Sequence, residues 1–366
     1  MLTVDVLNEL LLEAAAMRCT DLHLQPESPP LRRLNGVLEP HGSEPIDMTD
    51  TLGMLKNILR ADQWKKFEAC GDFDFAYMID EQHRFRVNAY RMMHGVALAF
   101  RILHADILDF ESLRLPPVIR EMSESPRGLI MVTGVTGSGK TTTMGTMIRH
   151  ISKSRPWHIL TIEDPIELIH PNSTSLVSQR ELGRHCRSFF EGLKYALRQD
   201  PDCIMIGELR DQDTIRTAVS AAETGHLVMS TVHASEAHLT IDRILSFFAG
   251  GEQEQVRQQV AENLRGVISQ RLMSMKDGSG LVPALEILVG TSTVRKFILQ
   301  NRTTDLKTVM QNRDAGMQTF NNALIELVAE EMITEDQAME ASDNSAVLRR
   351  LLAGGVAGGD RSVLLG

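Results

Sequence analysis

The chain has 366 residues, of which 43% are hydrophobic and 23% are charged, so its composition is that of an ordinary globular protein. At about 150 residues per domain, this length predicts about two domains. The formal net charge of −10 disfavours a nucleic-acid scaffold, because such proteins neutralise phosphates with a clustered basic face. No nucleic-acid partner is therefore expected.

The cysteines and the N-terminus point to a cytoplasmic protein. Four scattered cysteines form no CxxC pair, so neither a structural zinc site nor a disulfide framework is expected. The first 19 residues lack a basic leader and a small-residue cleavage site, so they are not expected to be a signal peptide. No apolar run approaches the ~18 residues of a membrane span, so any membrane association is expected to be peripheral, through a partner.

Residues 1–104 are predicted to form a small α+β domain of PAS-like type. Apolar residues at helical spacing predict an opening amphipathic helix, and the Asn35-Gly36 pair predicts a hairpin turn within residues 31–38. Residues 51–69 have a helical pattern. Alternating patterns predict four further strands, in DLHLQ, FDFAY, RFRVNAY and VALAFRIL.

The rest of the chain is predicted to be an α/β ATPase core followed by helices. Residues 105–126, rich in proline, are expected to be a linker. From residue 127 the runs GLIMVTG, HILTIED, CIMIGE and HLVMSTVH do not alternate, which is typical of parallel strands buried on both faces. We therefore expect a RecA-like parallel-sheet domain over residues 127–290, a helical region over 291–350 and a flexible Gly-rich tail over 351–366.

The octapeptide GVTGSGKT, residues 134–141, fits the phosphate-loop pattern G-x-x-x-x-G-K-[ST] at every fixed position. A predicted strand precedes it and a predicted helix follows, as this motif requires. Backbone amides and the helix N-terminus would cradle phosphate oxygens, Lys140 would reach the β- and γ-phosphates, and Thr141 would ligate Mg²⁺. ATP and Mg²⁺ are therefore expected, on Gly134, Val135, Thr136, Gly137, Ser138, Gly139, Lys140, Thr141 and Thr142.

Acidic residues follow two of the predicted core strands. Glu163 ends HILTIE, with Asp164 and Glu167 close behind, and Glu208 follows CIMIG. The carboxyl ends of parallel strands face the ligand crevice, where an acid can hold Mg²⁺, directly or through water, or activate the attacking water. The alternative is that these strand ends are simply solvated, and Asp164, which precedes a proline, can instead shape the turn.

Histidines and arginines supply further candidates. His226 and His233 flank one apolar strand and are ~23 Å apart at ~3.3 Å per residue, so they cannot share a metal ion. His233 lies at the ligand end of that strand. Arg86 and Arg101 lie on predicted strands of the first domain, where fixed guanidinium groups are suited to clamping phosphates, although a solvated sheet face is the alternative.

Four motifs in this order and spacing resemble the secretion ATPase superfamily: GVTGSGKTTT, ILTIEDPIE, ALRQDPDCIMIGELRD and AAETGHLVMSTVHA. The segments TDLHLQPESPPLRRLNG and GMQTFNNALIELVAEEMIT narrow the resemblance to the type IV pilus retraction ATPases, which drive twitching motility. The resemblance covers about residues 1–345. In that family the second nucleotide motif ends in Gly-Glu, as it does here, rather than in aspartate.

The resemblance implies roles for the candidate residues. Glu208 would be the general base, Glu163 would help position water and Mg²⁺, and His226 and His233 match the histidine box. Arg86 and Arg101 match arginines that reach a nucleotide, usually at a subunit boundary. The family forms hexameric rings that pull pilin subunits back into the membrane, so an inner-membrane pilus platform protein is an implied partner.

Two departures from the family leave the role of the chain in retraction open. Members often carry Arg-x-x-x-Arg where this chain has Lys194 and Arg198, and lysine cannot offer the bidentate fork of arginine. The main retraction motor usually carries an Ala-Ile-Arg-Asn-Leu-Ile helix, which is STVRKFI here, residues 292–298. The chain is thus expected to be the main motor or an accessory retraction ATPase beside a paralogous motor.

Two functions outside retraction have less support in the sequence. A pilus-assembly or type II secretion ATPase usually has a longer N-terminal region and a four-cysteine zinc loop, neither of which is found in this sequence. A non-hydrolysing ATP-binding subunit would not need the residues that are intact here, namely Lys140, Thr141, Glu163 and Glu208.

Overall fold

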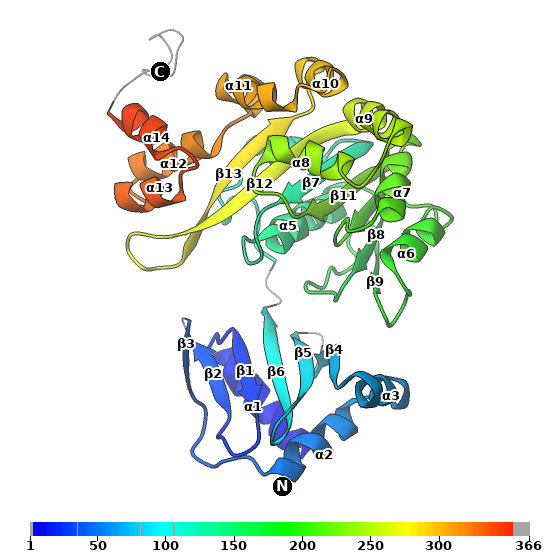
Figure 1. Cartoon of the computed structure of the whole chain (residues 1–366), viewed down its shortest axis with the longest axis vertical. Coiled ribbons are helices and arrows are strands. Elements are labelled where there is room, and N and C mark those ends of the chain that lie inside the picture. Colours follow the sequence, from blue (N-terminus) through cyan, green and yellow to red (C-terminus); the bar gives the residue numbers. More distant parts are fainter. Residues whose placement is uncertain (1–2, 35, 81, 105–106, 354–366) are drawn as a thin grey trace. The chain divides into compact units, whose positions relative to one another are not determined.

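The computed structural model describes residues 3–34, 36–80, 82–104 and 107–353. Its backbone contacts divide the chain into two compact units (Figure 1). Unit 1 comprises residues 1–106 and 165–169, and unit 2 comprises residues 107–164 and 170–366. In the part of the chain that the structure describes, no helix has both the length and the apolar character needed to cross a membrane.

Unit 1 is built on a six-stranded antiparallel sheet, in the order β3-β2-β1-β6-β5-β4. Side chains alternate across these strands: Phe85, Val87 and Ala89 are fully buried, whereas Arg86 between them is exposed. One face of the sheet therefore packs into the core, and the other, the open face, carries the exposed Arg86 although Arg84 on the same face is buried. Its strands are β1 (Asp21–Leu24), β2 (Leu31–Leu34), β3 (Val37–Pro40), β4 (Asp72–Met78), β5 (His83–Met92) and β6 (Gly95–His104).

Three helices supply the other half of the unit 1 core: α1 (Val4–Ala16), α2 (Met48–Ile58) and α3 (Ala61–Cys70). Their buried residues, such as Leu7, Leu55 and Phe67, belong to the same hydrophobic cluster as the inward residues of the sheet. The α+β prediction is thus confirmed. The segment 51–69, predicted to be helical, forms α2 and α3, which the extended backbone of Leu59 and Arg60 separates. Asn35 of the predicted turn lies outside the described residues, but β2 and β3 pair as a hairpin.

Unit 2 contains a seven-stranded sheet in the order β13-β12-β7-β11-β10-β8-β9. All neighbouring pairs are parallel except β12 and β13, which form an antiparallel hairpin. The predicted parallel-sheet core is therefore confirmed. Its strands are β7 (Gly128–Thr133), β8 (His158–Glu163), β9 (Leu176–Glu181), β10 (Cys203–Ile206), β11 (Leu227–Val232), β12 (Leu264–Ser274) and β13 (Leu281–Val289).

Helices cover both faces of this sheet, which explains why its central strands are apolar throughout. Leu129 and Met131 of β7 pack in one cluster, whereas Ile130 and Val132 pack in another. The second cluster contains α4 (Pro117–Ser123) and α5 (Lys140–Ser154). The first contains α6 (Phe189–Ala196), α7 (Gln212–Glu223), α8 (Ala237–Leu245), α9 (Gly251–Asn263), α10 (Ser292–Leu299) and α11 (Leu306–Gln311).

The C-terminal helices α12 (Phe320–Ala329), α13 (Glu335–Ala341) and α14 (Ser345–Leu352) form a smaller core against the far end of the β12–β13 hairpin (Figure 1). The sequence predicted these helices but neither the hairpin nor β9. The expected flexible tail falls largely on residues 354–366, which lie outside the described residues.

From residue 107 onward, the structure differs from the linker expected over residues 105–126. Helix α4 lies in this segment, with Pro117 as its first residue, a position where the missing proline N–H costs no hydrogen bond. Ile119 is fully buried and Met122 nearly so, in the same cluster as α5. The prolines therefore begin a packed helix rather than an extended connection.

Replacement of Ile119 should destabilise unit 2. Ile119→Ala leaves a cavity and is expected to lower the free energy of unfolding by about 2–4 kcal/mol. Urea unfolding followed by the fluorescence of Trp157, in a Trp64→Phe background, measures this in unit 2 alone. Glu121→Ala on the exposed side of α4 is the control and should change the value by less than about 0.5 kcal/mol. Equal stability of the two variants would mean that α4 is not packed.

Candidate active site

The phosphate loop connects the end of β7 to the start of α5. Gly134, Gly137 and Gly139 have φ angles of 138°, 79° and 86°, a region that side chains strongly disfavour. A Cβ at Gly134 would lie 2.4 Å from the carbonyl oxygen of Gln270. The loop therefore needs glycine for its conformation and, at Gly134, also for space. This is the backbone form in which successive N–H groups can turn towards an anion.

Two side chains, one from the loop and one from β12, stabilise the loop and the start of α5. Lys140 Nζ donates to the carbonyl oxygens of Gly134 and Val135, at 2.9 and 2.8 Å. Gln270 of β12 accepts a hydrogen bond from Thr143 Oγ1 at 2.7 Å, one turn into α5. The loop is thus fixed to the neighbouring strand, and the Lys140 ammonium group lies across its mouth. Ser138 Oγ is buried and has no hydrogen-bond partner among the described residues.

Glu163 ends β8 and is 5% exposed. Its Oε1 accepts hydrogen bonds from Thr161 Oγ1 at 2.6 Å and from Gln179 Nε2 at 3.0 Å. These two neutral donors hold the carboxylate in one orientation. Asp164, next along the chain, is exposed, and Glu167 is half-buried.

Glu208 follows β10 and is held between two basic side chains. Its Oε2 is 2.6 Å from Arg210 Nε, and its Oε1 is 3.1 Å from His233 Nε2. Gly207 lets the backbone approach β8 closely, since a Cβ there would lie 3.3 Å from the carbonyl oxygen of Ile162. The Gly207 carbonyl also accepts from Thr231 Oγ1 at 2.6 Å, which fixes the strand end that presents Glu208.

The sheet brings four of the predicted elements to one edge. Strands β7, β11, β10 and β8 are parallel neighbours, so their carboxyl ends lie side by side. The phosphate loop follows β7, His233 follows β11, Glu208 follows β10 and Glu163 ends β8. An anion on the loop would therefore have a lysine and two carboxylates around it, one of them next to a histidine, which are the groups needed to orient and deprotonate a water.

His226 and Arg198 lie at the opposite edge of the sheet. His226 precedes β11, and its Nδ1 is 2.9 Å from the carbonyl oxygen of Ala221. Arg198 follows α6 on the approach to β10 and is exposed. Six strand residues separate this edge from the phosphate loop, about 20 Å at about 3.3 Å per residue. Neither residue lies at the phosphate-loop edge, and their role in nucleotide binding stays a prediction.

Arg86 and Arg101 belong to unit 1, where they are directly paired across β5 and β6 on the open face of the sheet. Arg101 Nε is 3.1 Å from Asp21 of the next strand, β1. Three strands thus present an Arg-Arg-Asp row. The role of both arginines as nucleotide contacts stays a prediction.

Sequence reasoning missed three supporting residues of the site. Gln270 lies more than 120 positions after the phosphate loop, and no local sequence pattern indicates its contact with Thr143. Arg210 stands two residues after Glu208, and this spacing was the only signal for it. Gln179 comes from β9, the strand that was not predicted.

A family model for type II/IV secretion system proteins matches residues 2–352. The chain belongs to this family. Among its relatives, the twitching motility protein of Neisseria gonorrhoeae is 41% identical over 317 residues, or 86% of this chain and 85% of that protein. The type IV pilus retraction ATPase PilT of Pseudomonas aeruginosa is 40% identical over 335 residues, or 91% and 97% of the two chains.

A solved structure agrees with the family assignment. The crystal structure of the pilus retraction motor PilT with bound ADP matches this chain with a TM-score of 0.87 and 39% identity, covering 96% of this chain and all of the other. The resemblance to type IV pilus retraction ATPases and the α/β fold that it implied are therefore confirmed.

One buried histidine near Glu163 should make stability depend on pH. Burial, followed by the charge of Arg149, lowers the pKa of His170 to about 4. The folded state thus keeps His170 neutral down to about pH 4, whereas the unfolded state protonates it below about pH 6.5. The unfolded state binds more protons in this window, so stability falls as pH falls, by about 2 kcal/mol from pH 7 to pH 5.

Urea unfolding of the wild type and of His170→Gln at both pH values tests this. The variant should lose about 2 kcal/mol less than the wild type on acidification. The exposed His94→Gln is the matched control and should follow the wild type. Parallel pH profiles for wild type and His170→Gln would contradict the assignment.

Proposed function

We propose that this protein is a Mg²⁺-dependent ATPase that powers type IV pilus retraction and twitching motility. The observation that carries the proposal is the single sheet edge at which the phosphate loop, Lys140 and the His233–Glu208 pair meet. The relatives at about 40% identity, named for pilus retraction and twitching motility, supply the biological output. The site supports hydrolysis and the relatives support what the hydrolysis drives.

The reaction is the in-line attack of water on the γ-phosphorus. The loop amides and Lys140 bind the β- and γ-phosphate oxygens and stabilise the charge that develops on them. Glu208 accepts a proton from the attacking water as its oxygen bonds to phosphorus. The bond from the γ-phosphorus to the bridging oxygen then breaks, which leaves ADP and phosphate. His233, in contact with the same carboxylate, orients it and lies where it can sense the γ-phosphate.

The residues present suit a nucleotide-bound Mg²⁺. The glycine cradle of the loop has no room for a Cβ at Gly134, and a threonine and an acid flank it. Thr141, at the start of α5, and Glu163 would hold the ion, Glu163 directly or through water. When bound, Mg²⁺ neutralises charge on the phosphate oxygens.

His226 and Arg198, at the sheet edge opposite the phosphate loop, favour a ring. In a hexamer, Arg86, Arg101, His226 and Arg198 would reach the nucleotide of a neighbouring subunit and couple its hydrolysis to movement between subunits. An arginine that contacts a transferring phosphate stabilises the transition state strongly. The ring would act at the cytoplasmic side of the bacterial inner membrane, on the pilus platform protein.

A second candidate is an accessory retraction ATPase that works beside a paralogous main motor. Two departures favour it. Lys194 on α6 is exposed and offers a point charge where the family often has an arginine fork. Helix α10 carries the STVRKFI variation, although Arg295 is kept and pairs with Glu262 of α9 at 3.0 Å.

Replacement of the proposed base should separate binding from hydrolysis. Glu208→Gln keeps the size and hydrogen bonding of the side chain but cannot accept a proton. Phosphate release from Mg·ATP should fall by about 10²–10⁴-fold, with ATP affinity within about threefold of the wild type. The exposed Glu68→Gln of unit 1 is the control and should turn over normally. Wild-type protein that binds ATP but never hydrolyses it, even with a candidate partner motor, would contradict the motor proposal.

Deletion of the gene should leave bacteria that assemble pili but cannot retract them, because the motor acts after assembly. Piliation by electron microscopy and twitching on agar measure the two properties separately. Cells without any pili would instead indicate an assembly motor. Normal retraction until a paralogous ATPase is also deleted would indicate the accessory role.

A further inference from the structure

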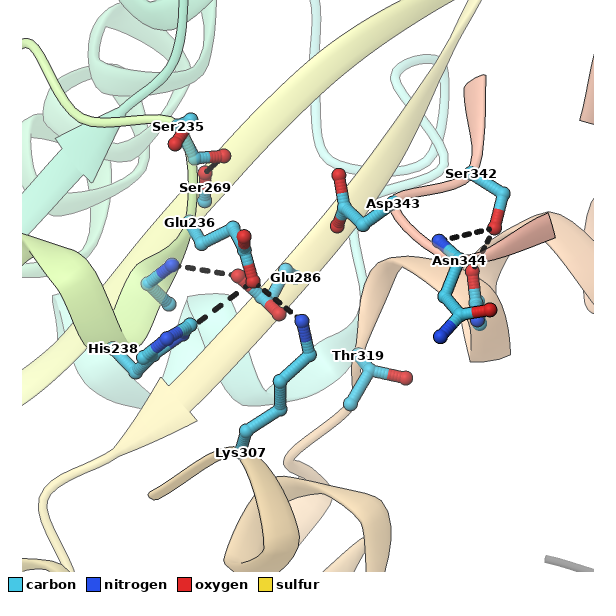
Figure 2. A network of polar contacts seen from close by, with 12 residues as sticks. Ser235, Glu236, His238, Ser269, Glu286, Lys307, Thr319, Ser342, Asp343 and Asn344 are labelled. Atoms are coloured by element: carbon cyan, nitrogen blue, oxygen red, sulfur yellow. Dashed lines mark hydrogen bonds and ion pairs between the residues drawn. The ribbon is translucent and has the colours of Figure 1, made fainter. Parts of the chain in front are cut away.

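A second cluster of polar side chains lies in unit 2, beyond the loop that carries His233 (Figure 2). Glu236 and His238 lie at the start of α8, and Glu286 comes from β13. One oxygen of each glutamate and one ring nitrogen of His238 all lie within 4.8 Å of one another. Lys307 of α11 points towards the two glutamates, and its Nζ is 2.7 Å from Glu236 Oε2.

Two of these side chains are buried with an unsatisfied atom. Glu286 is 1% exposed, and its Oε2 accepts from the backbone N–H of Ala237 at 2.6 Å. Its Oε1 has no hydrogen-bond partner among the described residues. His238 is 7% exposed, and its Nδ1, 3.5 Å from Glu236 Oε2, also has none there. Buried polar atoms are nearly always paired, so two in one cluster indicate a missing partner.

The charges show which kind of partner is missing. Lys307 pairs with Glu236, and Arg271 pairs with the nearby Asp343. In the described part of the cluster, Glu286 forms no ion pair of its own, although Lys307 lies close by. The cluster therefore has one cation, Lys307, for two glutamates, and it offers two carboxylate oxygens and one imidazole nitrogen.

We propose that Glu236, His238 and Glu286 form a binding site for a divalent transition-metal ion of the Zn²⁺ class. A nitrogen donor beside two oxygen donors suits Zn²⁺ better than Mg²⁺ or Ca²⁺, which prefer oxygen ligands alone. Bonds of about 2.0–2.2 Å put tetrahedral ligands about 3.3–3.6 Å apart, so the donors need to close by about 1 Å. Three protein ligands leave the fourth position to water.

The site would clamp the segment that follows His233. Ser269 Oγ of β12 already donates to the Ser235 carbonyl oxygen at 3.2 Å, and Glu286 holds Ala237. An ion on Glu236, His238 and Glu286 adds a further link between the start of α8 and β13. The ion is distinct from the nucleotide's Mg²⁺, because these ligands lie outside the phosphate loop.

Calorimetric titration of chelator-treated, full-length protein with Zn²⁺, without nucleotide, tests the proposal. A Cys70→Ser background removes the exposed thiol, which is an alternative Zn²⁺ ligand. The parent should bind one Zn²⁺ per chain. Glu286→Gln and His238→Gln should each weaken binding by at least tenfold. Glu68→Gln and His94→Gln, exposed in unit 1, are the matched controls and should bind as the parent does.

Two outcomes would overturn the proposal. One is a parent protein that binds no Zn²⁺ in the micromolar range. The other is equal binding by all variants, which would assign the ion to adventitious surface ligands. Circular dichroism melts show whether each variant is folded. Should Glu286→Gln not fold, His238→Gln decides alone: weakened binding by a folded variant supports the site, and unchanged binding rejects it.

Discussion

A sheet buried on both faces can place polar chemistry only where its strands end, and the candidate active site depends on this constraint. Strands β7, β8, β10 and β11 are apolar along almost their whole length because helices cover both sides. Since these strands are parallel, their carboxyl ends share one edge, and residues from four distant parts of the sequence meet there. The opposite edge receives His226 and Arg198 for the same reason. One topological rule thus separates the groups proposed to act on a chain's own nucleotide from His226 and Arg198, which are proposed to act on a neighbour's.

The two carboxylates at the site differ in how they are held, and this difference suits two roles. Glu163 is buried between a hydroxyl and an amide, neutral donors that fix its direction. Glu208 is paired with Arg210, which is mostly exposed, and with His233, which is half-exposed. A buried carboxylate fixed by neutral donors is suited to permanent positioning. A carboxylate held by exposed basic groups can change partners when phosphate arrives, because screened surface pairs are weak.

Local patterns predicted the parts of this molecule that are locally encoded. The phosphate loop follows from glycine conformation and the fixed Lys140, and the core strands follow from uninterrupted apolar runs. The residues that support the site could not be predicted in this way, because they bond to residues far away in the sequence. Gln270 bonds to Thr143, and Gln179 bonds to Glu163. Gln179 also comes from β9, a strand whose polar, half-buried sequence resembles a loop. Helix α4 was not predicted, because prolines occur both in linkers and at the first position of helices. Only the packing of the residues after Pro117 distinguishes the two. The sequence therefore predicted the residues of the candidate site, but not the residues that hold them in place.

Strand β12 connects the region of the phosphate loop to the C-terminal helical region. Gln270 faces the phosphate loop, and the next residue, Arg271, faces the other way, where it donates to Ala341 and Asp343 at the C-terminal helices. Adjacent positions of this strand thus contact α5, just after the phosphate loop, on one side and the C-terminal helical region on the other. A displacement of the start of α5 on nucleotide binding would therefore reach β12 through a direct side-chain hydrogen bond. The C-terminal helices would then register occupancy of the loop without any contact with the nucleotide itself.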